Sequence, residues 1–138
     1  MRPLTIEGVE EVALELARYH MEWSEPIPDF STRTPGILES CLLNSFQTFG
    51  GKELYPTLFD KAGAIFYQMI KNHPFVNGNK RIAVTSLLVF LHINGYWLRV
   101  DNEELYEIAV WVAKSPSTAS RGMMVALAEM IQKHCVEK

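Results

Sequence analysis

The nine residues 73–81, HPFVNGNKR, carry the side chains of this 138-residue sequence that are best suited to chemistry. His73 can accept or release a proton near neutral pH. Gly78 has no Cβ, so a ligand can come close to its backbone, and Lys80 and Arg81 place two cations next to it. An apolar run, IAVTSLLVFLHI, starts at residue 82 and predicts a buried helix. Because the first N–H groups of a helix bind anions, the stretch predicts a phosphate site with a base beside it.

The side chains around this helix start suit a phosphate-containing ligand. Arg81 can bind phosphate oxygens through two parallel N–H groups, Lys80 acts as a point charge, and Asn79 can support the turn or donate to an oxygen. Taken one at a time, these residues could also form a plain turn between two helices. Two cations at a helix N-terminus oppose the helix dipole, however, and this favours a bound anion. Base and anion site together indicate transfer of a phosphate-containing group.

The elements that must position this stretch are mostly helices. Helical spacing of apolar residues begins after Thr5, after Thr34–Pro35 and at Thr57. Residues 82–93 are apolar on nearly all sides, which is typical of a helix in the centre of a bundle. Two more helices are expected, one from a capping-box-like start at Asp101–Glu104 and one from Ser117 to about His134.

Three segments are not expected to be helical. The stretch 23–36, WSEPIPDFSTRTPG, is a proline-rich loop, and 50–56, GGKELYP, predicts a short hairpin. Residues 96–100, YWLRV, predict a short strand or an extended link. The sequence therefore predicts one all-α domain over residues 1–138, with about six helices around a central buried helix and a small β-hairpin.

Composition excludes several classes of protein. The net charge is −3, so no overall field attracts nucleic acid. The N-terminus has no apolar signal core, and the longest apolar run is shorter than the roughly 18 residues that span a bilayer. A location in the cytoplasm is therefore expected. Cys41 and Cys135 lack metal-ligand spacing and are interpreted as unpaired thiols.

The stretch HPFVNGNKR resembles the signature loop of the Fic/Doc family, His-x-Phe-x-(Asp/Glu/Asn)-(Gly/Ala)-Asn-(Gly/Lys)-Arg, at all seven constrained positions. The resemblance extends over about residues 30–115 and includes a hairpin flap. Lys80, together with Val84 where AMP-transferring members have a further Arg, resembles the death-on-curing (Doc) toxin branch. That branch implies a kinase that transfers the γ-phosphate of ATP to a threonine of elongation factor Tu and so blocks translation.

The resemblance also implies roles for single residues. His73 would activate the target hydroxyl, Phe75 would anchor the loop, and Asn77 would stand where many members bind Mg²⁺ through a carboxylate. The ATP phosphates would be held by Gly78, Asn79, Lys80 and Arg81, and the target protein would dock on a flap formed by Lys52, Glu53, Leu54 and Tyr55.

The inhibitory Fic motif, (Ser/Thr)-x-x-x-Glu-(Gly/Asn), is not met at Glu7–Gly8, because Pro3 stands four residues earlier. Inhibition by a separate, Phd-like antitoxin protein is therefore expected. Two alternatives stay open. The chain could be a nucleotidyl transferase on the same scaffold, or, since Asn77 is a weaker Mg²⁺ ligand than a carboxylate, a weakly active or inactive relative that binds a nucleotide or a partner.

Overall fold

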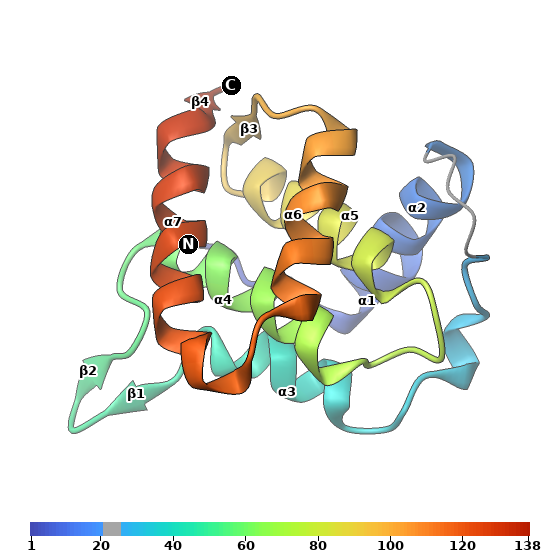
Figure 1. The fold of residues 1–138 in the computed structure, drawn as a ribbon, viewed down its shortest axis with the longest axis horizontal. Coiled ribbons are helices and arrows are strands. Elements are labelled where there is room, and N and C mark those ends of the chain that lie inside the picture. Colours follow the sequence, from blue (N-terminus) through green and yellow to red (C-terminus); the bar gives the residue numbers. More distant parts are fainter. Residues whose placement is uncertain (21–25) are drawn as a thin grey trace.

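A computed structural model describes residues 1–20 and 26–138 (Figure 1). Within these residues the expected all-α architecture of six helical segments and one small hairpin is confirmed. The first segment is continuous but contains a π-helical stretch, η1. The helices are α1 (Ile6–Gly8), η1 (Val9–Ala13), α2 (Leu14–His20), α3 (Ile37–Asn44), α4 (Leu58–Asn72), α5 (Asn79–Ile93), α6 (Asn102–Lys114) and α7 (Ser120–His134), with 3₁₀ turns η2 (Phe30–Thr32) and η3 (Ser117–Ala119).

Helix α5 is the central helix that the sequence predicts. It packs against α4, α6 and the first helical segment, and its side chains are buried on nearly all sides. Phe90 lies at the centre of this core, with its ring edge-on to Phe46 at a centroid distance of 6.5 Å. Because α5 is apolar on nearly all sides, it is held in the centre of the bundle. This packing fixes the position of its N-terminal end, which carries the motif cations.

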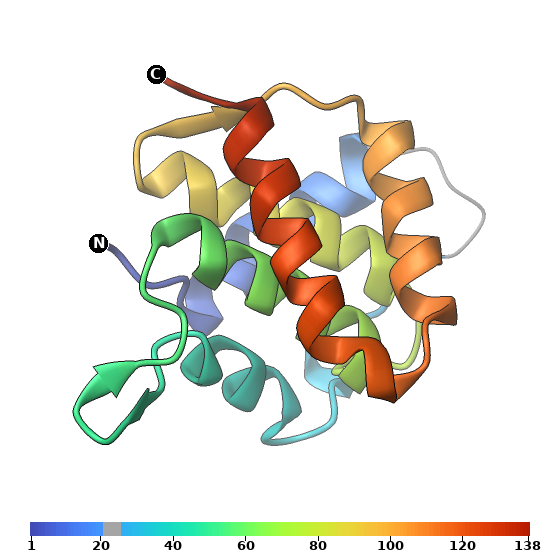
Figure 2. The ribbon, with the colours of Figure 1, turned by 60° about the vertical axis from the view of Figure 1, so that its left-hand side comes forward.

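Helices α4 and α7 approach each other closely at Gly63. A Cβ atom at this position would lie 3.2 Å from the backbone N of Ala128 and 3.2 Å from the carbonyl O of Met124. Glycine therefore lets the two backbones meet with no side chain between them. Figure 2 shows α7 crossing in front of α4.

Several expected starts and turns are confirmed. Thr5 caps α1 by accepting from the N–H of Gly8, and Thr57 forms a capping box with Asp60 at the start of α4. The hairpin consists of β1 (Thr48–Phe49) and β2 (Lys52–Glu53), paired antiparallel. Its turn residues Gly50 and Gly51 both have positive φ, as a two-residue hairpin turn of type I′ requires.

Other details differ from the prediction. Helix α3 starts at Ile37 after Gly36 in the left-handed region, so the start expected at Thr34–Pro35 was wrong. Asp101 precedes α6 but makes no side-chain cap hydrogen bond. The strand β3 (Tyr96–Leu98) forms as expected and pairs with β4 (Cys135–Glu137), a strand that the sequence did not predict. Residues 23–25 of the expected proline-rich loop lie outside the described residues.

No helix in the described ranges 1–20 and 26–138 is long and apolar enough to cross a membrane.

Candidate active site

The loop that follows α4, residues 73–78 (here the motif loop), begins with His73 in a left-handed conformation. His73 has φ 51° and ψ 63°, and it is the one non-glycine residue with positive φ among the described residues. Pro74 keeps His73 out of the right-handed helical region, because that region is disfavoured for a residue before proline. The chain must therefore leave the helix at His73. The imidazole is exposed at this corner, where it can meet a substrate.

Asn79 holds the motif loop in shape. Its Oδ1 accepts from the N–H of Phe75 at 3.0 Å, and its Nδ2 donates to the carbonyl O of Phe75 at 2.9 Å. Nδ2 also lies 3.4 Å from Nδ1 of His73. One buried amide thus satisfies both backbone groups of Phe75 and touches the imidazole ring. The side chain of Asn79, expected to bind ATP phosphate, is engaged within the loop, and its backbone N–H at the helix start is the group that remains suited to an anion.

A second segment, residues 26–34 (the cover segment), packs on the motif loop. The N–H of Thr34 donates to the carbonyl O of Pro74 at 2.9 Å. The rings of Phe30 and Phe75 lie 6.1 Å apart, and Phe75, the residue expected to anchor the loop, is buried. A proline-rich stretch was the one local signal at this segment, and it did not predict the packing, because the contacts join residues about 40 positions apart.

Gly78 faces the cover segment and not open solvent. It is buried, with φ +71°, and a Cβ atom there would lie 3.2 Å from Cδ1 of Ile27 and 3.3 Å from the carbonyl O of Pro26. The expectation that its missing Cβ admits a ligand is therefore corrected: the missing Cβ admits residues 26–28. Its positive φ also suits the tight entry into α5.

The two motif cations have different surroundings. Arg81 is buried in the first turn of α5, and its Nη2 donates to the carbonyl O of Ala17 in α2 at 2.7 Å. Lys80 is half-buried and has no hydrogen bond or ion pair within the described part of the chain. Arg81 therefore ties α5 to α2, whereas Lys80 lies in the first turn of α5, the end of a helix at which anions are favoured.

Asn77 fits the position of a metal ligand in one respect. Its Oδ1 is buried and has no hydrogen-bond partner among the described residues. An amide oxygen of this kind can bind a hard cation, and Mg²⁺ is commonly held by one or two protein groups together with substrate phosphates. The described residues contain no cluster of three His, Cys, Asp or Glu side chains that could hold a metal ion without such help.

The hairpin residues that were expected to dock a target do not lie beside His73. The hairpin precedes the N-terminus of α4, whereas His73 follows its C-terminus. A helix of 15 residues is about 22 Å long. Figures 1 and 2 both show the hairpin projecting from the body on the side away from the motif loop.

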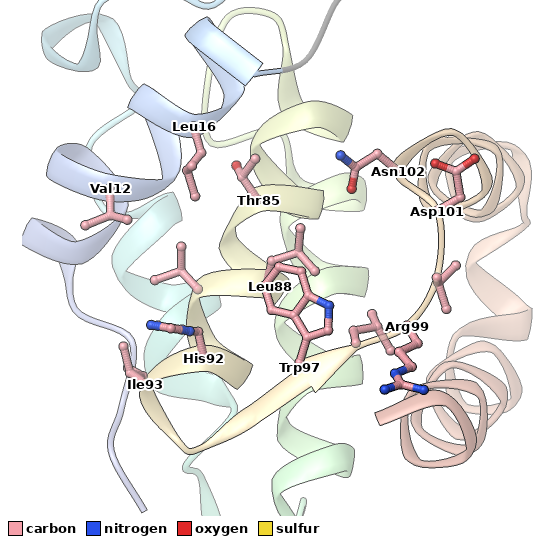
Figure 3. Close-up of a pocket in the computed structure, with 13 residues that line it drawn as sticks. Val12, Leu16, Thr85, Leu88, His92, Ile93, Trp97, Arg99, Asp101 and Asn102 are labelled. Carbon is pink, nitrogen blue, oxygen red and sulfur yellow. The ribbon is translucent and has the colours of Figure 1, made fainter. Parts of the chain in front are cut away.

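A large groove lies elsewhere, along α5. It has a volume of about 850 Å³ and is lined mainly by apolar side chains. Figure 3 shows Val12 and Leu16 on one wall, Thr85, Leu88 and His92 on the floor, and Trp97, Arg99 and Asp101 on the other wall. None of residues 73–81 lines it.

Burial makes both cysteines poor nucleophiles. It raises the pKa of Cys41 and of Cys135 to about 11, and both are unpaired thiols, as the sequence predicts. Neither cysteine is suited to catalysis at neutral pH.

Near the cover segment, backbone hydrogen bonds and the guanidinium of Arg33 hold the pKa of Glu39 below its usual value.

Comparison with known proteins decides the family. The profile of the Fic/DOC family matches residues 3–91, from before α1 almost to the end of α5. The chain belongs to the Fic/Doc family. Its members use nucleotide substrates, and membership implies a transferase.

One curated relative is similar to part of this chain. Toxin Doc of Mycolicibacterium smegmatis is 38% identical over 73 residues, which cover 53% of this chain and 56% of the relative. The chain thus spans little more than half the length of that toxin.

Proposed function

We propose that this Fic/Doc protein is a toxin kinase that transfers the γ-phosphate of ATP to a hydroxyl side chain of a target protein, with elongation factor Tu as the first candidate. The observation that carries the proposal is the exposed His73 at a left-handed corner, with its Nδ1 3.4 Å from Nδ2 of Asn79, the first residue of α5 and the neighbour of Lys80 in sequence. A base and an anion-binding helix end then serve one reacting group. The likeness to Toxin Doc supports the toxin role.

The proposed roles follow from these positions. His73 accepts the proton of the target hydroxyl while the hydroxyl oxygen forms a bond to the γ-phosphorus of ATP. The bond between the γ-phosphorus and ADP breaks, and ADP leaves. The N-terminus of α5 binds phosphate oxygens through the backbone N–H of Asn79 and the ammonium of Lys80, and Arg81 holds this helix end against α2. Asn77 would bind Mg²⁺, which would offset phosphate charge. Through its two hydrogen bonds to Phe75, Asn79 also holds the loop that carries His73 in a fixed position relative to the start of α5.

Residue 84 supports phosphoryl over nucleotidyl transfer. AMP-transferring relatives carry an Arg at this place, whereas Val84 is fully buried in α5. No cation reaches the phosphate site from this position, and Lys80 supplies the charge instead. The orientation of the nucleotide that suits a kinase is therefore favoured.

The test is mass spectrometry of a purified translation mixture incubated with the protein, ATP and Mg²⁺, beside the His73→Ala variant. We expect one protein to gain about 80 Da, the mass of a phosphoryl group, only with the unsubstituted chain. A gain of about 329 Da would establish an AMP transferase in its place. No mass change with either chain would support an inactive relative.

We also propose that a separate antitoxin binds the groove along α5. The groove is open, apolar and bounded by η1 and α2 on one wall and by β3 on the other, so it suits the apolar face of a partner helix (Figure 3). Val12 and Trp97 are exposed at its edges. Val12→Glu and Trp97→Glu should abolish binding of the product of a small neighbouring gene yet leave toxicity intact. Unchanged binding by both variants would place the antitoxin elsewhere.

A further inference from the structure

Thr34 of the cover segment is bonded to the motif loop one residue away from His73, the proposed base. Its N–H donates to the carbonyl O of Pro74 at 2.9 Å, and Pro74 follows His73 directly in the chain. From the bond lengths along this path, the Cα atoms of Thr34 and His73 are at most about 11 Å apart. Both residues are exposed to solvent. The fold therefore brings an exposed threonine into the vicinity of the exposed imidazole.

The hydroxyl of Thr34 is not engaged as a donor. It makes no hydrogen bond within residues 1–20 and 26–138, the part of the chain that the structure describes. By contrast, the hydroxyl of Thr32, two residues earlier, donates to the carbonyl O of Asp29 at 2.6 Å. A hydroxyl that attacks phosphorus must give its proton to a base, so a hydroxyl already bonded to a carbonyl is the poorer nucleophile. Of these two threonines, Thr34 is therefore the one suited to receive a transferred group.

The backbone around Thr34 lies on the motif loop in the manner of an extended peptide. Arg33 has an extended backbone, with φ −64° and ψ 152°, and Pro35 favours the same form for Thr34. Main-chain hydrogen bonds from an extended segment are also a common way in which proteins hold a peptide. The cover segment thus contacts the loop as a bound peptide would, with a hydroxyl-bearing residue at the point of contact.

Contacts on the N-terminal side of Thr34 and with α3 hold it in this place. The ring of Phe30 packs on that of Phe75, and the guanidinium of Arg33 lies 4.4 Å from the Phe30 ring centroid. Nη2 of Arg33 also donates to Oε2 of Glu39 at 3.3 Å. An acceptor group that is held near a reacting centre has a high effective concentration there. Thr34 therefore has an advantage over a hydroxyl that must arrive from solution.

We propose that Thr34 is a site of self-modification, which receives the γ-phosphoryl group of ATP at the active site of its own chain. This inference rests on the proposed function. The hydroxyl oxygen of Thr34 forms a bond to the γ-phosphorus while the bond between that phosphorus and ADP breaks. The hydroxyl proton passes to His73, and ADP leaves with the electron pair of the broken bond. The products are phosphothreonine and ADP, and no further reactant is needed.

The first test is mass spectrometry of the purified chain after incubation with ATP and Mg²⁺, with no other protein present. We expect a gain of about 80 Da, which fragmentation of the tryptic peptide 34–52 assigns to Thr34. Thr34→Val, which keeps the backbone N–H, and His73→Ala should gain no mass, whereas Thr34→Ser, which keeps a hydroxyl, should gain it. The matched control is Ser31→Ala, which removes an exposed hydroxyl from the same segment and should be modified at the rate of the parent.

The second test asks whether donor and acceptor belong to one chain. Over about a hundredfold range of protein concentration, the fraction of chains modified per minute should stay constant, because the step is intramolecular. In a mixture of Thr34→Val, which keeps the base, and His73→Ala, which keeps the acceptor, Thr34 should stay unmodified. A rate that rises in proportion to concentration, or modification in this mixture, would show that a second copy is the acceptor and overturn the proposal.

Parallel reactions that contain the purified translation mixture separate this inference from the proposed function. If a target protein gains about 80 Da while Thr34 stays unmodified, or if another hydroxyl of the chain is modified in its place, the role of Thr34 is wrong and the kinase stands. If neither the chain nor any target gains mass, the proposed function fails and this inference fails with it. A gain of about 329 Da on Thr34 would overturn phosphoryl transfer and keep Thr34 as the acceptor.

Discussion

At each end of α4 a polar side chain holds the adjoining segment in place, and the two side chains do so with different chemistry. At the C-terminal end, Asn79 holds the motif loop through two hydrogen bonds to Phe75, of 3.0 and 2.9 Å. At the N-terminal end, Lys61 holds the hairpin through a carboxylate, a carbonyl and an aromatic ring. A neutral amide can satisfy one donor and one acceptor with fixed geometry, whereas an ammonium has three donors that rotate.

This difference in bonding indicates which end of α4 holds its adjoining segment more rigidly. An amide that bonds to both backbone groups of one residue allows little movement, and the loop it holds carries the proposed base. The ammonium of Lys61 holds the hairpin through donors that can rotate, so its contacts restrict the geometry less than those of the amide do. We infer that the catalytic end is rigid and that the hairpin end is anchored but compliant.

The largest effect is expected from Asn79→Ala, which would break the catalytic end. It leaves the buried N–H and C=O of Phe75 unpaired, at a cost of about 1–3 kcal/mol in the free energy of unfolding. A displaced His73 should lower kcat about a hundredfold. Chemical denaturation and label transfer measure the two effects. Asn79→Asp, which keeps the acceptor and loses the donors, should be the milder loss of stability. If Asn79→Ala weakens ATP binding at unchanged stability, Asn79 is a ligand and not a loop anchor.

Gly63→Val should come next, because it changes the helix that joins the two ends. The added side chain meets backbone atoms of Met124 and Ala128, so we expect a loss of about 1–3 kcal/mol in unfolding free energy. The matched control is Gly122→Ala in α7, where a Cβ meets nothing within 4 Å. This control should raise stability by about 0.5–1 kcal/mol, as helical Gly→Ala changes do. Equal effects of both substitutions in thermal unfolding would contradict the close contact of α4 and α7.

A smaller effect is expected from Asn77→Asp, which sharpens the chemistry of the catalytic end alone. The buried Oδ1 would become part of a carboxylate, a stronger ligand for Mg²⁺. Calorimetric titration with nucleotide present should show roughly tenfold tighter Mg²⁺ binding. Hydrogen exchange at the hairpin end, measured at the Leu54 N–H that donates to the carbonyl O of Gln47, should not change. An unchanged Mg²⁺ affinity would remove Asn77 from the metal site.

The smallest effect should be seen with thiol reagents. Cys41 lies near the catalytic end, where Nδ2 of Asn72 is 3.9 Å from its Sγ, and burial raises its pKa to about 11. At pH 8 it should be alkylated roughly a hundred times more slowly than a free cysteine with its usual pKa. Because the unfolded thiol ionises near pH 9, this group contributes stability below that pH, which is lost as the pH rises towards 11. Rapid alkylation of folded protein would show that the catalytic end opens.

Much of the fold could be predicted because it depends on local pattern. Thr5 and Thr57 cap helices as expected, and Gly50–Gly51 forms the hairpin turn. The start of α3 was missed because Pro35 resembles a first helical residue, yet Gly36 adopts a left-handed conformation and delays the helix. Strand β4 was missed because its partner β3 lies about 40 residues earlier, beyond the reach of local pattern.

The sequence by itself determined the family motif, the residue types at the phosphate site and the central place of α5, since apolar periodicity and a nine-residue signature are local properties. Tertiary structure alone decided that residues 26–28 fill the space beside Gly78, that Arg81 bonds to α2, that the hairpin lies about one helix length from His73, and that Lys61 is buried. The physical reason is that burial and hydrogen-bond partners depend on which distant segments pack together. From sequence alone a lysine is expected to be exposed to solvent. Only the tertiary structure places the three partners of Lys61 around its ammonium group.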